Sequence, residues 1–231
     1  MPRILTSALL ANPYRTAQAV VADRLRRAVL SGQMAPGSRL LQAAVAAEMR
    51  TSTTPVREAM RELAGEGLLD LDPHRGVVVH QPSVGELQEI YQIRSLLEPV
   101  AIAGTVERIT PDQLAMAEQI LDLMERQTDV AEWALLNATY HSALAEGSAL
   151  PILTSILEKL RYLSTLYVAS FVDRHPDRIR KANEEHRALL EACRARDIAL
   201  AQELEVAHLQ HTLIIGEEQL ATVRRSSAAG S

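Results

Sequence analysis

The spacing of apolar residues in the first quarter of the chain predicts three short helices. Val21, Leu25 and Val29 recur at helical intervals and predict a helix over residues 16–31, which Gly32 ends. After a turn rich in small residues, the pattern predicts two more helices with a break between them, over residues 41–49 and 52–64.

Two short apolar runs, 68–71 and 77–79, follow and predict strands joined by a turn at 72–76. From there the pattern is helical, with predicted helices over residues 84–108, 111–127, 130–147, 150–171, 177–195 and 197–223. Two helices with a tight break and then a hairpin are the plan of a winged helix-turn-helix, and six helices without strands indicate a bundle. We therefore predict a mainly α protein with a flexible arm (1–13), a winged helix-turn-helix domain (14–80), a linker (81–83), a six-helix domain (84–223) and a disordered tail (224–231).

Composition supports this picture. Aromatic residues make up 3% of the 231 residues, which favours helices over strands. Apolar runs stay well short of the roughly 18 residues of a membrane span, and the N-terminus carries no convincing cleavage signal. We expect a soluble cytoplasmic protein without a membrane partner. The single cysteine, Cys193, excludes an internal disulfide and is expected to be an inert thiol.

Charge is divided unevenly along the chain. The net charge is −5, but residues 1–80 hold 10 Arg and no Lys against 7 acidic residues, a balance of +3. The remainder holds 14 basic against 22 acidic residues, a balance of −8. A basic N-terminal part and an acidic C-terminal part indicate that only the N-terminal part contacts phosphate.

The predicted helix 52–64 has two contrasting faces. Its apolar face is formed by Val56, Ala59, Met60 and Leu63. The opposite face carries Thr54, Arg57 and Arg61, with Thr53 nearby. Arginine can donate two hydrogen bonds to guanine, and threonine can bind phosphate or touch a thymine methyl. The predicted turn between the strands adds Arg75 and Gly76. An ordinary small domain with a solvated Thr/Arg face is the alternative.

Read in order, these segments resemble the GntR family of bacterial regulators over residues 16–80. The motif Thr54-Pro55-Val56-Arg57-Glu58-Ala59 carries most of the resemblance, followed by Glu66-Gly67-Leu68 and the Gly76-Val77 hairpin. The resemblance implies DNA contacts at Ser52, Thr53, Thr54, Arg57 and Gly76. Arg39 and Arg50 are further phosphate candidates. Many members of the family carry arginine in place of Thr53, so the operator differs at that base or Arg50 and Arg61 compensate.

Three histidines in the second half suggest a metal site. Asn137 and His141 are four residues apart and share a helix face, while His186 and His208 lie on two later helices. Imidazoles that converge inside a bundle are typical ligands of Zn²⁺, Ni²⁺ or a similar ion. His211 lies one turn after His208 and is an alternative to it.

The same half resembles the FCD-type effector domain of the FadR subfamily over residues 84–215. The segments concerned are Arg94-x3-Glu98, Tyr140-His141, Glu185-His186 and His208-Leu209. The resemblance places Asn137 at a position that is usually aspartate. A neutral amide is a weaker ligand, which lowers metal affinity and favours an anionic effector. We expect a carboxylate at the metal with its other end on Arg94, unless Arg94 and Glu98 only form a salt bridge; the pattern leaves open whether Arg161 and Tyr162 line the cavity.

These features favour a dimeric regulator, a repressor of a palindromic DNA operator that responds to a small carboxylate. Two alternatives share parts of it. In the first, the metal itself is the signal. In the second, the histidines activate water in a metal-dependent hydrolase; no H-E-x-x-H motif or placed general base supports this, and an enzyme leaves the front domain unexplained.

Overall fold

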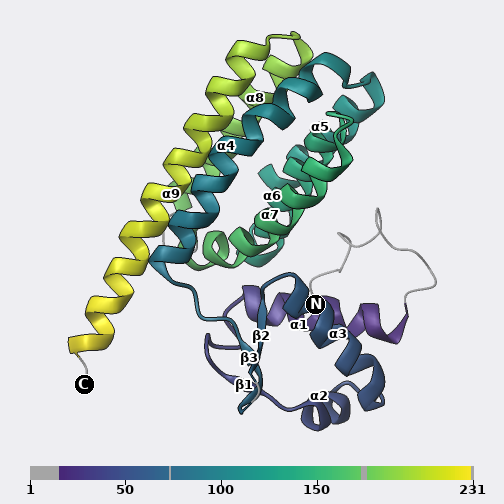
Figure 1. Ribbon diagram of the computed structural model, residues 1–231, viewed down its shortest axis with the longest axis vertical. Coiled ribbons are helices and arrows are strands. Elements are labelled where there is room, and N and C mark those ends of the chain that lie inside the picture. Colours follow the sequence, from purple (N-terminus) through teal and green to yellow (C-terminus); the bar gives the residue numbers. More distant parts are fainter. Residues whose placement is uncertain (1–15, 73, 173–175, 230–231) are drawn as a thin grey trace. The chain divides into compact units, whose positions relative to one another are not determined.

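The computed structural model describes residues 16–72, 74–172 and 176–229. Apart from Leu30–Gly32, which group with the second unit, they form two compact units that divide between His80 and Gln81 (Figure 1). The predicted arm, residues 1–13, lies outside the described residues. Among the helices that are described, none combines the length and apolar character that crossing a bilayer requires.

The first unit consists of short helices and a small sheet. Its helices are α1 (Ala17–Leu30), α2 (Gln42–Glu48) and α3 (Thr53–Gly65), and its strands are β1 (Arg39–Leu40), β2 (Leu69–Asp72) and β3 (Gly76–Val79). The sheet has the order β1-β3-β2 with antiparallel pairs, and Asp72 pairs with Gly76 beside the tip of the hairpin. The pattern missed β1, since two residues are too few to show alternation.

The core of this unit forms where α1 and α3 turn their apolar faces inward. Val56, Ala59, Met60 and Leu63 are all buried, which confirms the predicted inner face of α3. Leu25 of α1 and Val78 of β3 are buried as well. Because one face of α3 is fixed in this core, its other face is held outward.

The second unit contains six helices and no strand among its described residues, as predicted. They are α4 (Val84–Arg108), α5 (Pro111–Glu125), α6 (Val130–Glu146), α7 (Pro151–Val172), α8 (Pro176–Arg194) and α9 (Ile198–Ala229). α4 and α9 lie side by side (Figure 1). Thr110 begins α5 with a capping box in which it and Gln113 satisfy each other's backbone N–H groups.

The predicted disordered tail is wrong over most of its length. α9 continues to Ala229, past the predicted end at residue 223. Alanine, arginine and serine are all tolerated in helices, and the first strong helix breaker of this segment is Gly230. Composition alone gave no reason to stop the helix earlier.

Candidate functional site

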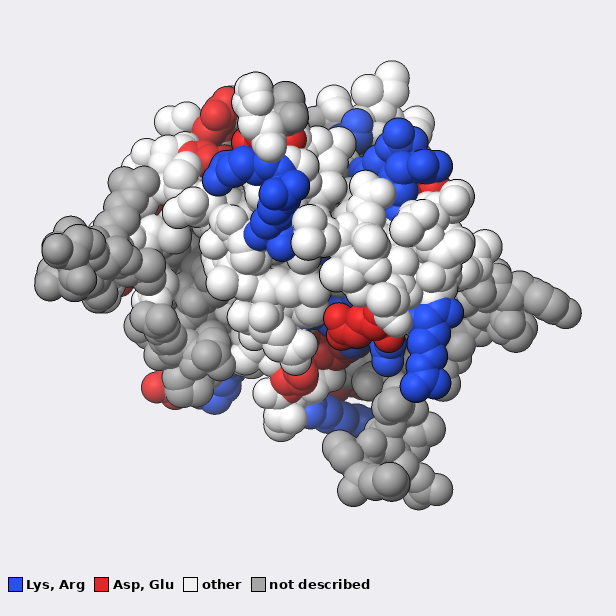
Figure 2. Space-filling view, turned by 90° about the horizontal axis from the view of Figure 1, so that it is seen from below, with Lys and Arg blue, Asp and Glu red and all other residues white. Residues whose placement is uncertain are grey.

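The residues predicted to contact DNA are all exposed in the first unit. They are Arg39, Arg50, Ser52, Thr53, Thr54, Arg57, Arg61, Arg75 and Gly76. On the face shown in Figure 2, basic side chains form separate groups, with uncharged surface and some acidic side chains between them. Such a surface suits contacts at distinct phosphates and bases better than a uniform positive field.

The beginning of α3 presents three hydroxyl side chains, those of Ser52, Thr53 and Thr54, and a helix N-terminus. Ser52 is the N-cap residue, but its hydroxyl makes no capping hydrogen bond. Arg57 and Arg61 both contact one carboxylate, because Glu58 Oε1 lies 3.3 Å from Arg57 Nε and 3.3 Å from Arg61 Nη1. All three side chains are substantially exposed, so these pairs are weak and can exchange for contacts to DNA.

The hairpin tip is shaped by Asp72. Its Oδ1 accepts hydrogen bonds from the backbone N–H groups of His74 (2.7 Å) and Arg75 (2.8 Å), and its Oδ2 lies 3.2 Å from Arg75 Nε. The backbone N–H of Arg75 contributes most to lowering the pKa of the Asp72 carboxyl. Gly76 has φ +79°, which other residues rarely adopt, so the turn by itself requires glycine.

Arg50 occupies the break between α2 and α3 with φ 51°, a left-handed conformation that costs a residue with a side chain about 1–2 kcal/mol. We expect Arg50→Gly to leave the free energy of unfolding within about 0.5 kcal/mol of wild type, because relief of strain offsets the flexibility of glycine. Operator affinity should fall, with a salt dependence reduced by about one phosphate contact. Thermal unfolding and binding titrations at several salt concentrations measure both effects. An unchanged salt dependence would remove Arg50 from the phosphate contacts.

Three buried histidines meet inside the second unit. His141 of α6, His186 of α8 and His208 of α9 each offer a ring nitrogen, and these atoms lie within 4.8 Å of one another. The ring centres are 4.6–5.3 Å apart. His141 Nε2 and both ring nitrogens of His186 are buried without a hydrogen-bond partner. Buried polar atoms normally have a hydrogen-bond partner, so these unpartnered nitrogens indicate a binding site for an ion or ligand.

The imidazoles are held in the neutral form that binds metal. Burial is the largest cause that lowers the pKa of each of the three histidines below its ordinary value, and neighbouring imidazoles lower those of His141 and His186 further. Neutral imidazole is the form that ligates a divalent ion.

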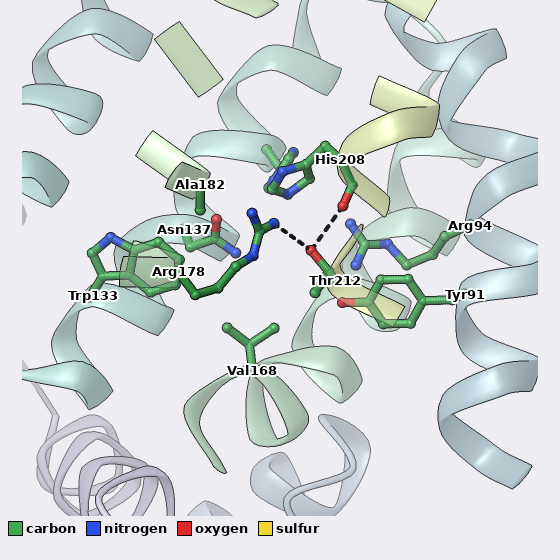
Figure 3. A pocket seen from close by; sticks show the side chains of 10 residues that line it. Tyr91, Arg94, Trp133, Asn137, Val168, Arg178, Ala182, His208 and Thr212 are labelled. Atoms are coloured by element: carbon green, nitrogen blue, oxygen red, sulfur yellow. Dashed lines mark hydrogen bonds between the residues drawn. The ribbon is translucent and has the colours of Figure 1, made fainter. Parts of the chain in front are cut away.

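Asn137 of α6 lines a cavity together with two of these histidines. Its Oδ1 is buried and unpartnered. Asn137, His141 and His208 line one cavity of about 20 Å³, which has room for an ion or a water molecule (Figure 3). The three histidines offer nitrogen donors that suit a divalent ion, and their buried cluster could hold one.

Two arginines, Arg94 and Arg178, are among the residues that line this cavity. Figure 3 shows Arg94 and Arg178 reaching toward the Thr212 hydroxyl from opposite sides. Arg94 does form the salt bridge with Glu98 (3.2 Å), and it also lines the cavity, so both interpretations of Arg94 apply. Arg161 is a second partner of Glu98 and lines two smaller cavities next to His141.

Three residues of this site were missed by the sequence analysis. Arg178 lines the cavity, Glu185 binds His208, and Glu205 lies with its Oε1 3.8 Å from His141 Nδ1. Burial raises the pKa of Glu205 to about 8. Helical spacing could have identified Glu205, because it is three residues before His208 and therefore lies on the same face of α9.

Burial distinguishes His208 from His211 and also bears on Cys193. His211 is exposed and contacts Glu185 at 3.1 Å, whereas His208 belongs to the buried cluster. Cys193 is buried, and burial raises its pKa to about 12, as expected for an inert thiol.

We expect the metal-free protein to lose stability as the pH falls from about 7.5 to about 5.5. Unfolded histidine titrates near 6.5, whereas the folded pKa values of His141 and His186 are lower. In that window the unfolded chain binds protons that the folded chain does not, which lowers the free energy of unfolding by up to about 1.4 kcal/mol per group and pH unit.

Thermal unfolding of metal-free wild type and His186→Leu across this pH range tests this prediction. The raised pKa of Glu205 has the opposite effect on stability, because the folded chain binds a proton there as the pH falls. Both proteins contain Glu205, so this effect is common to the two curves. We expect the shallower pH dependence in His186→Leu; equal slopes would contradict the prediction.

Comparison with known proteins places both units in families. Residues 17–79 match the bacterial regulatory proteins of the gntR family, and residues 89–211 match the FCD domain. The HTH-type transcriptional regulator McbR of Escherichia coli is 30% identical, over 77% of this chain and 82% of its own length. A probable D-xylose utilization operon transcriptional repressor of Paenarthrobacter nicotinovorans is 31% identical, over 84% of this chain and 86% of its own.

A solved structure agrees with these matches. That of E. coli McbR/YncC superposes with a TM-score of 0.74 at 26% identity, covering 89% of this chain and 99% of the other. The relatives are transcription regulators, not enzymes, which argues against the hydrolase alternative. The chain therefore belongs to the GntR family of DNA-binding transcription regulators, in the FadR-like subfamily that carries an FCD domain.

Proposed function

We propose that this regulator is a repressor that binds a palindromic operator as a homodimer and changes its operator affinity when a small carboxylate binds beside a metal ion. The unpartnered buried ring nitrogens of His141 and His186 are the observation that carries the effector half of the proposal. The relative from Paenarthrobacter nicotinovorans is a probable transcriptional repressor, which supports repression rather than activation.

On the DNA side, α3 acts as the recognition helix. Arg57 donates to a guanine, and the hydroxyls of Ser52, Thr53 and Thr54 at the start of the helix bind phosphate or base edges. Four arginines contribute phosphate contacts, namely Arg39, Arg50, Arg61 and Arg75, and Gly76 lets the wing backbone approach the duplex. A two-fold dimer places two such helices on the half-sites of a palindrome.

On the effector side, Asn137, His141, His186 and His208 hold a divalent ion such as Zn²⁺ or Ni²⁺. The ion supplies a positive centre that attracts a carboxylate oxygen. Arg94 receives the other end of the anion. Because the cavity measures about 20 Å³, its lining side chains must move apart to admit an organic anion, and this movement is the physical origin of a signal within the unit.

The small cavity also favours a second candidate, in which the metal itself is the effector. A space of about 20 Å³ accepts an ion without rearrangement. In that case the metal alone changes operator affinity, and a carboxylate adds nothing.

One titration series tests both candidates. An operator is first selected from random DNA with the full-length protein, and its affinity is then measured with metal-free protein, with Zn²⁺ or Ni²⁺, and with metal plus each of a set of small mono- and dicarboxylates. The main proposal expects a change of at least about five-fold only when metal and carboxylate are both present. A full change with metal alone supports the second candidate, and no selected sequence at all contradicts the operator assignment.

A further inference from the structure

The carboxylate of Glu185 contacts both His208 of the histidine cluster and Arg178, which lines the cavity. We infer that Glu185 is a positioning residue that aims His208 at the metal and holds Arg178 against the cavity, so that both halves of the effector site depend on one side chain. This inference rests on the proposed metal site, but one of its two readouts is measured on metal-free protein and does not depend on that site.

The contact with His208 determines which ring nitrogen faces the cluster. His208 Nδ1 lies 2.7 Å from Glu185 Oε2, and an ionised carboxylate only accepts hydrogen bonds. The proton of His208 is therefore held on Nδ1, which leaves the lone pair of Nε2 available as a ligand. A histidine ligand commonly has such a partner, which fixes its tautomer and the orientation of its ring.

The same carboxylate binds Arg178 with both oxygens. Arg178 Nη1 lies 2.8 Å from Oε1 and Nη2 lies 2.9 Å from Oε2, the parallel arrangement that orients a guanidinium most firmly. Arg178 is buried, so its position depends on this counterion more than that of an exposed arginine would.

Thr212 closes these contacts into a ring. Arg178 Nη2 donates to Thr212 Oγ1 at 3.1 Å, and Thr212 Oγ1 donates to the backbone carbonyl of His208 at 2.9 Å (Figure 3). The ring runs from Glu185 through His208 and Thr212 to Arg178 and back, and it joins α8 to α9. Within the ring each member contacts two neighbours, and Glu185 also contacts the exposed His211 at 3.1 Å. A shift of Arg178 toward an anion is therefore transmitted to His208 through Glu185.

Glu185→Gln tests the inference, with Glu184→Gln as its matched control. Glutamine offers one acceptor and places an amide N–H₂ against the donors of Arg178 and His208, so it cannot serve both. Glu184 is the adjacent residue and pairs with Arg180 on the surface, outside the ring. We expect Glu185→Gln to weaken zinc affinity about 10- to 100-fold, and Glu184→Gln to stay within about two-fold of wild type.

The second readout is the tautomer of His208 in metal-free protein, measured by ¹⁵N NMR of the histidine rings. We expect protonation on Nδ1 in wild type and in Glu184→Gln, and a mixture of tautomers in Glu185→Gln. This readout needs no metal, so a wild type that binds no zinc would contradict the proposed metal site while the tautomer still decides the role of Glu185.

Glu185→Asp covers the case in which the glutamine variant does not fold. It keeps the charge that neutralises Arg178 but shortens the reach to His208, so zinc affinity should fall and the tautomers should mix. An unchanged tautomer of His208 together with wild-type zinc affinity, in either folded variant, would overturn the inference.

Discussion

Arg57→Ala should weaken binding to the selected operator by about 1–3 kcal/mol, or roughly 5- to 150-fold, and relax the base preference at one position of each half-site. Arg57 lies on the exposed face of α3, and the opposite face is fixed in the core by Val56 and Met60. Its contact with Glu58 is weak and solvent-exposed, so the guanidinium is free to exchange it for a guanine edge.

Arg27→Ala is the matched control. Arg27 is a partly exposed arginine of the same unit, paired with Asp23 within α1, and it is not among the proposed contacts. Titrations with the selected operator and with single-base variants of it should show wild-type binding within about two-fold for Arg27→Ala. Arg57→Ala should also keep its thermal stability, since surface substitutions change it by about 0.5 kcal/mol or less. If both variants bind equally well, α3 does not read DNA through Arg57.

The elements that the pattern predicted best are those with long periodic stretches. The inner face of α3 and the six helices of the second unit follow from apolar residues at helical spacing, because burial of such a face decides the fold of each segment. β1 was missed because Arg39 and Leu40 carry too little pattern. The end of α9 was placed too early because composition does not reveal where a helix of acceptable formers stops.

The candidate site was predictable only in part, for a different physical reason. Histidines stand out because they are few and suit metals, so His141, His186 and His208 could be selected before their convergence was visible. Glu185, Arg178 and Glu205 belong to residue types that are usually solvated, and helical spacing gives a shared face without saying which face points inward. Only the packing of α8 against α9 brings Arg178 and Glu185 to the cluster.

Arg50, the left-handed residue at the helix-turn-helix break, illustrates the same limit. Arg50 was selected for its charge, and its left-handed backbone is visible only in the structure. Gly76 is the opposite case. It was predicted as a DNA contact, and its positive φ shows that the turn itself requires glycine.

His186→Ala should lose stoichiometric metal, with zinc affinity reduced by more than about 100-fold, because a direct ligand contributes more than an outer partner. His186 is completely buried, and neither of its ring nitrogens has a hydrogen-bond partner, so both are available to a metal ion. Elemental analysis and competition with a chelator measure the loss. Zinc at about 1,000 times its Kd should stabilise wild type by about 4 kcal/mol and His186→Ala far less, which thermal unfolding shows independently.

Two companion variants complete this experiment. His211→Ala should leave metal binding unchanged, and Asn137→Asp should strengthen it. His211 is exposed and outside the cluster, so His211→Ala should retain metal. Asn137 presents a neutral amide oxygen to the cavity, and aspartate would place a full negative charge there, so Asn137→Asp should bind zinc at least about 10-fold more tightly. A tighter site would also be more fully neutralised and should hold an anionic effector less strongly. If Asn137→Asp gained no affinity while His186→Ala lost it, the three histidines would bind the ion without residue 137, and the effector would have to be attracted by the arginines alone.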